Sequence, residues 1–270
     1  MVKTKTKVIQ KIAKGIVCID NFLEESYLEG ILGCINDLSW KTSYSQGGER
    51  SSIQYKTKNY KKSIVEYKII ESLRKFLFSE ENISKTYSTL EAHDGKLKYS
   101  LSTILNNLDL RTTEKGLNDN FPEKIFLKFI RNPLYKFEKI KKLSREMRKL
   151  LCGPKFHTTF SISSTNGSYY ENPHVDQQNK LFVGLLYLDD SNLKSSTNLT
   201  FWNVKKNNIL KFDKNLYVVD TPLEKITNIQ QKRNRLILFK NNKEAIHSAK
   251  GNTKTNRRFI YFSLVASNDF

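Results

Sequence analysis

The pattern of apolar positions predicts strands and helices in the first third of the chain. Residues 15–22 (GIVCIDNF) form an apolar run typical of a β-strand. Residues 24–38 place apolar side chains at helical spacing, and the glutamates at 24 and 25 suit the start of a helix. A second amphipathic helix is predicted within residues 61–78. The inward-facing positions are expected to be Leu28, Ile31, Leu32 and Ile35 in the first helix, and Ile64, Ile69, Leu73 and Phe76 or Leu77 in the second.

The middle of the chain has a different pattern. Residues 79–123 are polar, have few apolar anchors and contain turn signals such as Asn106-Asn107, so we expect an insertion or mobile cover outside the core. A third helix is predicted over residues 134–151, directly after Pro133. One face of this helix is strongly basic, which is typical of a solvated surface and is also a candidate site for an anionic partner.

From about residue 156 the chain consists of short apolar runs separated by polar turns. No long helical pattern lies between these runs, which favours an antiparallel sandwich or barrel. The predicted strands are 156–162, 180–188, 198–204, 216–220, 235–239 and 257–266. No Pro-rich or Gly/Ser-rich linker divides the halves, so residues 1–270 are predicted to form one domain. In it, a helical and strand layer (1–155) packs on a β core (156–270).

Composition supports a globular protein with a basic surface. The chain has 46 Lys and Arg against 27 Asp and Glu, a formal charge of +19, and 38% hydrophobic residues. The positive excess is spread over both halves, and lysine rather than arginine supplies most of it. This distribution is more typical of a solvated lysine surface than of a nucleic-acid-binding patch, and a polyanion-facing role is the alternative interpretation.

Two further features concern location. No run approaches the roughly 20 apolar residues of a membrane helix, so membrane insertion is not expected. The three cysteines, Cys18, Cys34 and Cys152, are too few and too scattered for a disulfide framework or a cysteine zinc site. A reducing, cytoplasmic setting is therefore expected, whereas the sequence gives no indication of the oligomeric state.

Candidate chemistry centres on the four histidines. His174 and Asp176 are two residues apart in the segment ENPHVDQQ, so in an extended chain their side chains point to the same side. His247 lies between two predicted strands, where a neighbouring strand could bring it beside this pair. Two imidazoles and one carboxylate form the facial triad that holds Fe(II) and leaves positions open for an oxidant and a co-substrate. Two surface histidines with a turn aspartate remain the alternative interpretation of these residues.

The order of motifs over residues 155–266 resembles the 2-oxoglutarate- and Fe(II)-dependent dioxygenases, particularly their prolyl-4-hydroxylase-like branch. The resemblance lies in the sequence of six short motifs together, and the N-terminal segment 15–32 is similar to the first strand and helix of that branch. The motifs are PHVD (173–176), GLLYLDD (184–190), NLTFW (198–202), NRLILF (234–239), IHSAKG (246–251) and NRRFIYFS (256–263).

The resemblance implies a fold, a reaction and a set of cofactors. The fold is mainly β, with a double-stranded β-helix (jelly-roll, cupin-like) core flanked by α-helices. The reaction is hydroxylation of an unactivated C–H bond, coupled to decarboxylation of 2-oxoglutarate to succinate. Fe(II), 2-oxoglutarate and O2 are required, with ascorbate as a supporting reductant. The substrate is expected to be a small molecule, a sugar acid or a peptidyl residue, and the Lys and Tyr content of residues 79–123 suits an anionic one.

The same resemblance implies roles for individual residues. His174, Asp176 and His247 match the iron ligands. Arg257, ten residues after His247, matches the cation that binds the distal carboxylate of 2-oxoglutarate. Tyr187 matches a position whose hydroxyl helps to hold that carboxylate.

Several positions leave alternatives open. Because side chains alternate along a strand, only one of Arg257 and Arg258 can point into the barrel, and spacing favours Arg257. Phe259 replaces a small polar residue of many relatives, which keeps Arg258 in question. Asn172 and Ser248 flank the predicted ligands and are candidates to orient them. His93 and His157 have no counterpart in the motif, and we expect them to be structural or surface residues.

Two other functions are weighed against this one. A nucleic-acid oxidative demethylase of the same superfamily would suit the positive charge, but that branch carries a second arginine six residues after the first, where this chain has Ser263. A non-catalytic β-sandwich binding module would contain the triad by accident or without iron.

Overall fold

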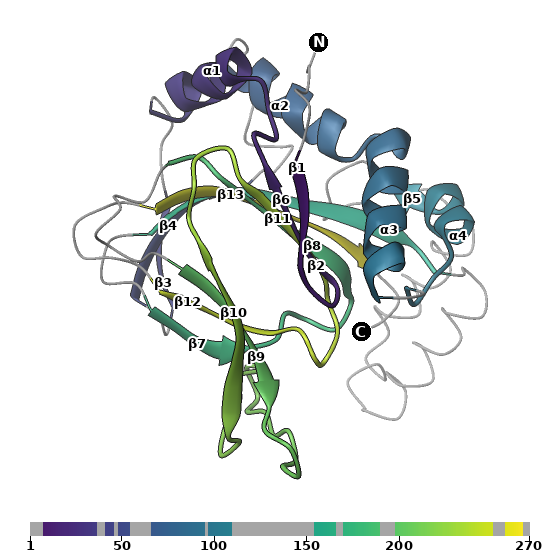
Figure 1. Cartoon of the computed structure of the whole chain (residues 1–270). Coiled ribbons are helices and arrows are strands. Elements are labelled where there is room, and N and C mark those ends of the chain that lie inside the picture. Colours follow the sequence, from purple (N-terminus) through teal and green to yellow (C-terminus); the bar gives the residue numbers. More distant parts are fainter. Residues whose placement is uncertain are drawn as a thin grey trace, which may run out of the picture.

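The computed structural model describes residues 8–36, 41–45, 48–54, 66–94, 97–109, 154–165, 170–189, 198–250 and 257–266. Two β-sheets form the centre, and the described helices lie over the outer face of the larger sheet (Figure 1). The larger sheet has the order β1-β2-β11-β8-β13-β6-β4-β3, with β5 beside β6, and the smaller has the order β10-β9-β12-β7. Every ladder is antiparallel except the short pairing of β5 with β6.

The bounds of these elements follow the chain from the N-terminus. The larger sheet comprises β1 (Val8–Ala13), β2 (Ile16–Asp20), β3 (Lys41–Ser45), β4 (Gly48–Gln54), β5 (Leu108–Asp109), β6 (Phe156–Thr165), β8 (Lys180–Tyr187), β11 (Leu236–Lys240) and β13 (Arg257–Ala266). The smaller sheet comprises β7 (Tyr170–His174), β9 (Asn198–Val204), β10 (Leu223–Gln230) and β12 (Ile246–Lys250). The helices are α1 (Glu25–Asn36), α2 (Glu66–Leu77), α3 (Glu80–Asp94) and α4 (Leu101–Asn106).

The strand order is that of a double-stranded β-helix. Of the eight strands β6 to β13, the larger sheet takes β6, β8, β11 and β13, and the smaller takes β7, β9, β10 and β12. The chain therefore crosses repeatedly between the two sheets, which is the jelly-roll arrangement. The predicted fold class is confirmed, and the two sheets enclose an interior in which functional side chains can converge.

Two apolar cores lie on opposite faces of the larger sheet. One core joins the sheet to the helices, and the other fills the space between the two sheets. Strand β13 contributes to both because its side chains alternate. Ile260, Phe262 and Leu264 belong to the helix-side core, whereas Phe259 and Tyr261 belong to the interior one.

The helical predictions are largely confirmed. All four apolar positions predicted for α1 are buried. In α2, Leu73 and Leu77 are buried as predicted, while Ile69 is only half-buried and its neighbour Ile70 is buried. The helix predicted over residues 134–151, with its basic face, lies outside the described residues.

The expectation that residues 79–123 stay outside the core is wrong for their described part. Residues 80–94 form α3, which contacts β2 and β11 and buries Ile83, Tyr87 and Leu90 in the helix-side core. The Ser79 hydroxyl accepts a hydrogen bond from the Asn82 backbone N–H (3.3 Å) at the start of this helix, as an N-cap residue does. These apolar residues stand at helical spacing, but the polar residues between them obscured the pattern.

One strand prediction is also wrong. Residues 216–220 form no strand in the structure, only isolated bridges from Tyr217 and Val218. The strand that pairs with β9 is instead β10, which begins at Leu223. This strand lies at a sheet edge and buries only Ile229, so its sequence lacks the apolar run on which the strand predictions were based.

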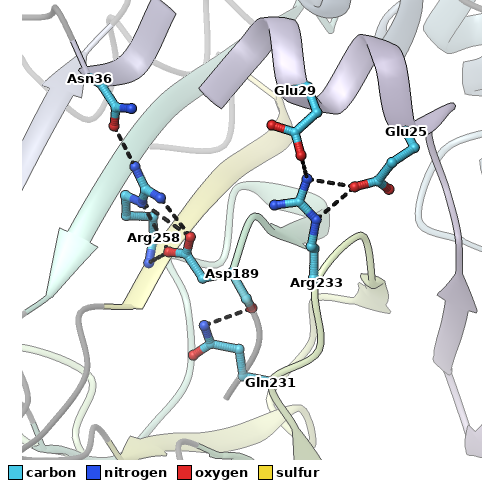
Figure 2. Close-up of polar contacts among 7 residues, drawn as sticks. All are labelled: Glu25, Glu29, Asn36, Asp189, Gln231, Arg233 and Arg258. Carbon is cyan, nitrogen blue, oxygen red and sulfur yellow. Dashed lines mark hydrogen bonds and ion pairs between the residues drawn. The ribbon is translucent and has the colours of Figure 1, made fainter. Parts of the chain in front are cut away.

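Helix α1 is tied to the β core by polar contacts, as Figure 2 shows. The Arg233 guanidinium forms ion pairs with Glu25 and Glu29 on α1. Its Nη2 lies 2.5 Å from Oε1 of each glutamate. Asn234 follows in a left-handed conformation (φ 61°), and its side-chain amide pairs with both backbone groups of Leu23 at 2.8 and 2.7 Å. These contacts fix the start of α1 beside the turn that precedes β11. Among the described residues, no helix is long and apolar enough to cross a membrane.

Candidate metal and co-substrate site

The smaller sheet brings two of the predicted metal ligands together. His174 ends β7 and His247 lies at the start of β12, and the two residues are direct partners in the antiparallel ladder. Their ring centroids are 4.4 Å apart. Asp176 follows two residues after His174, and its Oδ2 lies 3.8 Å from His247 Nε2. Residues separated by more than 70 positions along the chain therefore converge at one end of the barrel interior.

Backbone carbonyls set the orientation of both imidazoles. His174 Nδ1 lies 2.8 Å from the Asn172 carbonyl oxygen, and His247 Nδ1 lies 2.9 Å from the Ala245 carbonyl oxygen. A carbonyl oxygen can only accept, so each Nδ1 carries a hydrogen, and in the neutral ring Nε2 then keeps a free lone pair. This is the tautomer in which a histidine binds a metal through Nε2 while a second group fixes its ring.

The surroundings favour the ligand forms of these side chains. Burial, followed by the neighbouring His174, lowers the pKa of His247 from 6.5 to about 4, so His247 is neutral at neutral pH. Burial alone would raise the pKa of Asp176, but the charge of Lys180, its hydrogen bond to the carboxylate and the neighbouring imidazoles outweigh this effect, and the net result is a lowered pKa. A neutral imidazole and an ionised carboxylate are the states that bind a divalent cation.

Sequence reasoning missed two side chains that bind Asp176. The Lys180 ammonium forms an ion pair with Asp176 Oδ1 and donates a hydrogen bond to the Tyr261 hydroxyl (2.6 Å). The Tyr261 hydroxyl in turn donates to the same Asp176 oxygen at 3.2 Å. Side chains alternate along β13, so Tyr261 and Arg257 point to the same face of the sheet. This alternation could have identified Tyr261 from the sequence. For Lys180 the sequence offered no comparable signal.

The donor set fits a divalent iron, although the side chains are not gathered around a common point. Within the part of the chain that the structure describes, no three or more His, Cys, Asp or Glu side chains already form a metal-binding group. Two imidazole Nε2 atoms and one carboxylate are nevertheless the ligands of the facial triad. Lys180 and Tyr261 engage Asp176 Oδ1, which leaves Oδ2 on the side of His247.

Arg257 and Tyr187 lie together inside the barrel. Arg257 begins β13 with 3% exposure, and its Nη2 donates to the Tyr187 hydroxyl at 2.9 Å. The guanidinium also lies over the rings of Tyr187 and Phe259, with centroid distances of 5.1 and 4.8 Å. Its Nε is buried without a hydrogen-bond partner, and no carboxylate of the described residues pairs with it. A buried guanidinium without an anion is costly, which makes this position suitable for an anionic ligand.

Arg258 points to the opposite face of β13. Its guanidinium binds both oxygens of Asp189 at 2.7 to 3.2 Å and donates to Asn36 Oδ1 at 2.8 Å (Figure 2). The backbone N–H of Arg258 also donates to Asp189 Oδ2. Arg258 therefore joins β13 to the end of α1 and is occupied by a carboxylate of the protein itself.

The remaining candidate residues are dispersed. Asn172 contacts His174 through its backbone carbonyl rather than its side chain. Ser248 faces away from the His247 ring and accepts a hydrogen bond from Trp202 Nε1 at 2.9 Å. His157 lies on β6 opposite Val265, which is at the other end of β13 from Arg257. The side chain of His93 is not among those that the structure describes.

A loop between β9 and β10 covers one side of His174. The Tyr217 ring lies 5.4 Å from the His174 ring, and its hydroxyl donates to Glu171 Oε1 at 3.0 Å. The preceding residue, Leu216, has φ 67° and accepts a backbone hydrogen bond from Val175. No local sequence pattern indicates this contact, because it depends on how the loop folds back on β7.

Comparisons with known proteins give structural matches only. No protein-family model matches the chain, and no curated protein matches it. The solved structures that it resembles include a prolyl hydroxylase from Trichoplax adhaerens in complex with a hypoxia-inducible-factor peptide. That structure has a TM-score of 0.45 and 13% identity, over 93% of this chain and 84% of the other.

Two further matches have similar scores. A viral collagen prolyl hydroxylase from Paramecium bursaria Chlorella virus-1 has a TM-score of 0.42 and 11% identity, over 93% of this chain and 96% of that one. An oxidoreductase of the 2OG-Fe(II) oxygenase family from Burkholderia pseudomallei has a TM-score of 0.46 and 7% identity, over 93% and 84%. Identity is low in all three. The fold itself is established by the strand order.

Proposed function

We propose that this protein is an Fe(II)- and 2-oxoglutarate-dependent oxygenase that hydroxylates a C–H bond of a small-molecule or peptidyl substrate. The observation that carries the proposal is the buried Arg257 guanidinium. It lies inside the same barrel as His174, Asp176 and His247, and has a hydroxyl partner but no carboxylate partner among the described residues. An anionic co-substrate would supply that missing carboxylate.

Two groups of residues in the barrel interior would bind the iron and the co-substrate. His174 and His247 would bind the iron through Nε2, and Asp176 through its carboxylate, with Lys180 and Tyr261 holding the carboxylate in place. The bound iron would activate O2 together with 2-oxoglutarate, which is chemistry that protein side chains do not supply.

Arg257 and Tyr187 would bind the distal carboxylate of 2-oxoglutarate. The planar guanidinium matches a carboxylate with two parallel hydrogen bonds. Tyr187 accepts a hydrogen bond from Arg257, so its own hydroxyl hydrogen is free to donate to the same carboxylate. The rings of Phe239 and Phe201, 5.0 and 5.9 Å from the His247 ring, help to exclude water from the iron side of the site.

The two alternative functions have less support. The demethylase alternative would place an arginine at position 263, but Ser263 is buried there and shares a 2.6 Å hydrogen bond with Thr159. A binding module without iron would have no need for two imidazoles whose Nε2 atoms are both left free. Anaerobic addition of Fe(II) and 2-oxoglutarate distinguishes such a module from an oxygenase.

The first test is anaerobic addition of Fe(II) and then 2-oxoglutarate to the purified full chain. We expect a weak visible charge-transfer band, which arises when 2-oxoglutarate chelates the bound iron. His174→Ala should abolish the band, and Arg257→Ala should require far more 2-oxoglutarate to produce it. Arg258→Ala is the matched control, because it removes the adjacent arginine from the opposite face of the same strand.

The outcome is decisive when each variant is shown by circular dichroism to be folded. No band in the native protein would reject the oxygenase and favour the binding module. If the Arg257 and Arg258 variants need the same concentration of 2-oxoglutarate to produce the band, the assignment of Arg257 is rejected. Release of succinate in the presence of O2 provides an independent measure of the reaction.

A further inference from the structure

A basic cavity lies beside the predicted metal site, on the side of Asp176. Its volume is about 280 Å3, at the lower end of the range for small-molecule sites. Three segments that are distant in sequence form it: the residues before α4, the turn between β7 and β8, and the turn after β11. Asp176 is one of its lining residues, so the cavity reaches one member of the proposed ligand set.

The charge of the cavity is strongly biased. Lysine supplies four of its eleven described lining residues, although it makes up only about one residue in seven of the whole chain. These are Lys98, Lys180, Lys240 and Lys243, and the single acidic residue among the eleven is Asp176. Like charges gathered around a small concave space raise the local concentration of an oppositely charged ligand. The general lysine bias of the chain does not by itself account for this clustering.

The cavity also has a fixed polar wall. Asn241 donates from its side-chain amide to the carbonyl oxygens of Gln177 and Lys180, at 2.8 and 3.0 Å, and so joins the two turns. Its Oδ1 is buried and accepts no hydrogen bond from the described residues. The two hydrogen bonds that the amide donates therefore fix the turns that line the cavity relative to each other.

On the basis of the proposed oxygenase function, we propose that this cavity binds the acidic group, a carboxylate or a phosphate, of a small-molecule substrate. Lys240 and Lys243 attract the anion, and Lys180 lies between the anion and Asp176. A bound acid therefore shares the Lys180 ammonium with a proposed iron ligand, which places the substrate next to the metal site. The co-substrate occupies a different position, because Arg257 and Tyr187 are not among the residues that line this cavity.

Three molecules of similar size test the proposal: glycerol 3-phosphate, glycerate and glycerol. Each is titrated calorimetrically into the full chain, with and without saturating 2-oxoglutarate. We expect one or both acids to bind at least about tenfold more tightly than glycerol, the factor expected from a few partly screened charge pairs. The stronger of the two acids identifies the kind of acidic group that the cavity recognises.

Variants locate the binding site. The double variant Lys240→Gln/Lys243→Gln should weaken acid binding about tenfold, and Lys243→Gln alone, which changes an exposed side chain, should produce part of this loss. The matched control is Lys205→Gln/Lys206→Gln, which removes the same charge from the exposed residues after β9 and should leave binding within twofold.

Each other outcome overturns the proposal. Equal binding of glycerol and the acids, or no binding of any of them, would show that the cavity does not select anions. Loss of acid binding in Arg257→Ala, with binding retained in the lysine variant, would place the anion at the co-substrate position. Acid binding without a charge-transfer band would reject the oxygenase, and with it the substrate role, while leaving an anion site.

Discussion

Arg257 and Arg258 are adjacent in sequence and lie on opposite faces of β13. Arg257 is buried in the barrel, where its guanidinium binds the Tyr187 hydroxyl. Arg258 binds Asp189 through two nitrogens and connects the strand to α1 (Figure 2). Arg258 is therefore paired with a carboxylate of the protein, whereas Arg257 has none among the described residues and is the arginine that we propose to bind the co-substrate.

Replacing each arginine should separate these roles. Arg257→Ala should weaken 2-oxoglutarate binding about 100-fold, because it removes a buried charged partner of a carboxylate. Arg258→Ala should leave that affinity within about threefold, and should lower the free energy of unfolding by about 1 to 2 kcal/mol, a modest value because the pair is partly exposed. Co-substrate titration and urea denaturation of both variants provide the measurements. A large loss of affinity in Arg258→Ala would contradict the assignment.

The ion pair between Asp20 and Arg235 should make stability depend on pH in the acid range. Hydrogen bonds from Arg235 lower the pKa of Asp20 from 3.8 to about 2, with burial opposing and Lys232 assisting the shift. Because the folded-state pKa is depressed, this stabilisation is complete above about pH 4 and is lost as the pH falls through about 2. We expect it to be worth about 1 kcal/mol, after allowance for solvent screening.

The measurement compares native protein with Asp20→Asn by urea denaturation at pH 6, 4, 3 and 2.5. The variant should be less stable by about 1 kcal/mol at pH 6, and the difference should shrink to roughly a third of that value at pH 2.5. A difference that stays constant across this range would mean that the contribution of Asp20 does not come from its charge.

Gly184 in β8 should not tolerate a larger residue. A Cβ at this position would overlap the ring of Phe262, which lies directly across the ladder on β13. Gly184→Ala should therefore destabilise the protein by about 2 to 3 kcal/mol, a typical cost of overpacking a core. Thermal and urea denaturation measure the loss.

A second variant tests the cause of that loss. Phe262→Leu makes room beside Gly184, so the double variant should be less destabilised than the sum of the two single variants. Additive losses would show that Gly184 is required for a reason other than contact with Phe262.

The thiol of Cys18 should be nearly inert in the folded protein. Burial in β2 raises the pKa of Cys18 from 9.0 to about 11, so at pH 8 the thiolate fraction falls about 100-fold relative to an ordinary thiol. Iodoacetamide labelling followed by peptide mass spectrometry should modify Cys34, which is half-buried, before Cys18. In guanidinium chloride both should react equally, and fast labelling of Cys18 without denaturant would contradict the burial of β2.

The sequence determined the class of fold and the residues of the candidate site. Apolar runs in the C-terminal half predicted β6, β8, β9, β11 and β13. Strands β8, β11 and β13 are buried on both faces and are therefore apolar along most of their length, whereas β6 alternates between buried and partly exposed residues over most of its length. Helical spacing predicted α1, because the apolar residues at positions 28, 31, 32 and 35 lie on one face of a helix. The His-x-Asp pair, the distal histidine and the arginine pair could all be identified from residue type and order.

Tertiary structure decided what local pattern cannot encode. The alternation of β13 left two arginines as candidates, and only the packing of α1 and Asp189 on one face showed which of them is already paired. Strand β10 and helix α3 were missed because one lies at a sheet edge and the other has polar residues between its buried positions. The contacts of Lys180 and Tyr261 with Asp176 join residues up to 85 positions apart. Such contacts exist only once the sheets have closed, because side-chain neighbours across a barrel are set by register and not by sequence distance.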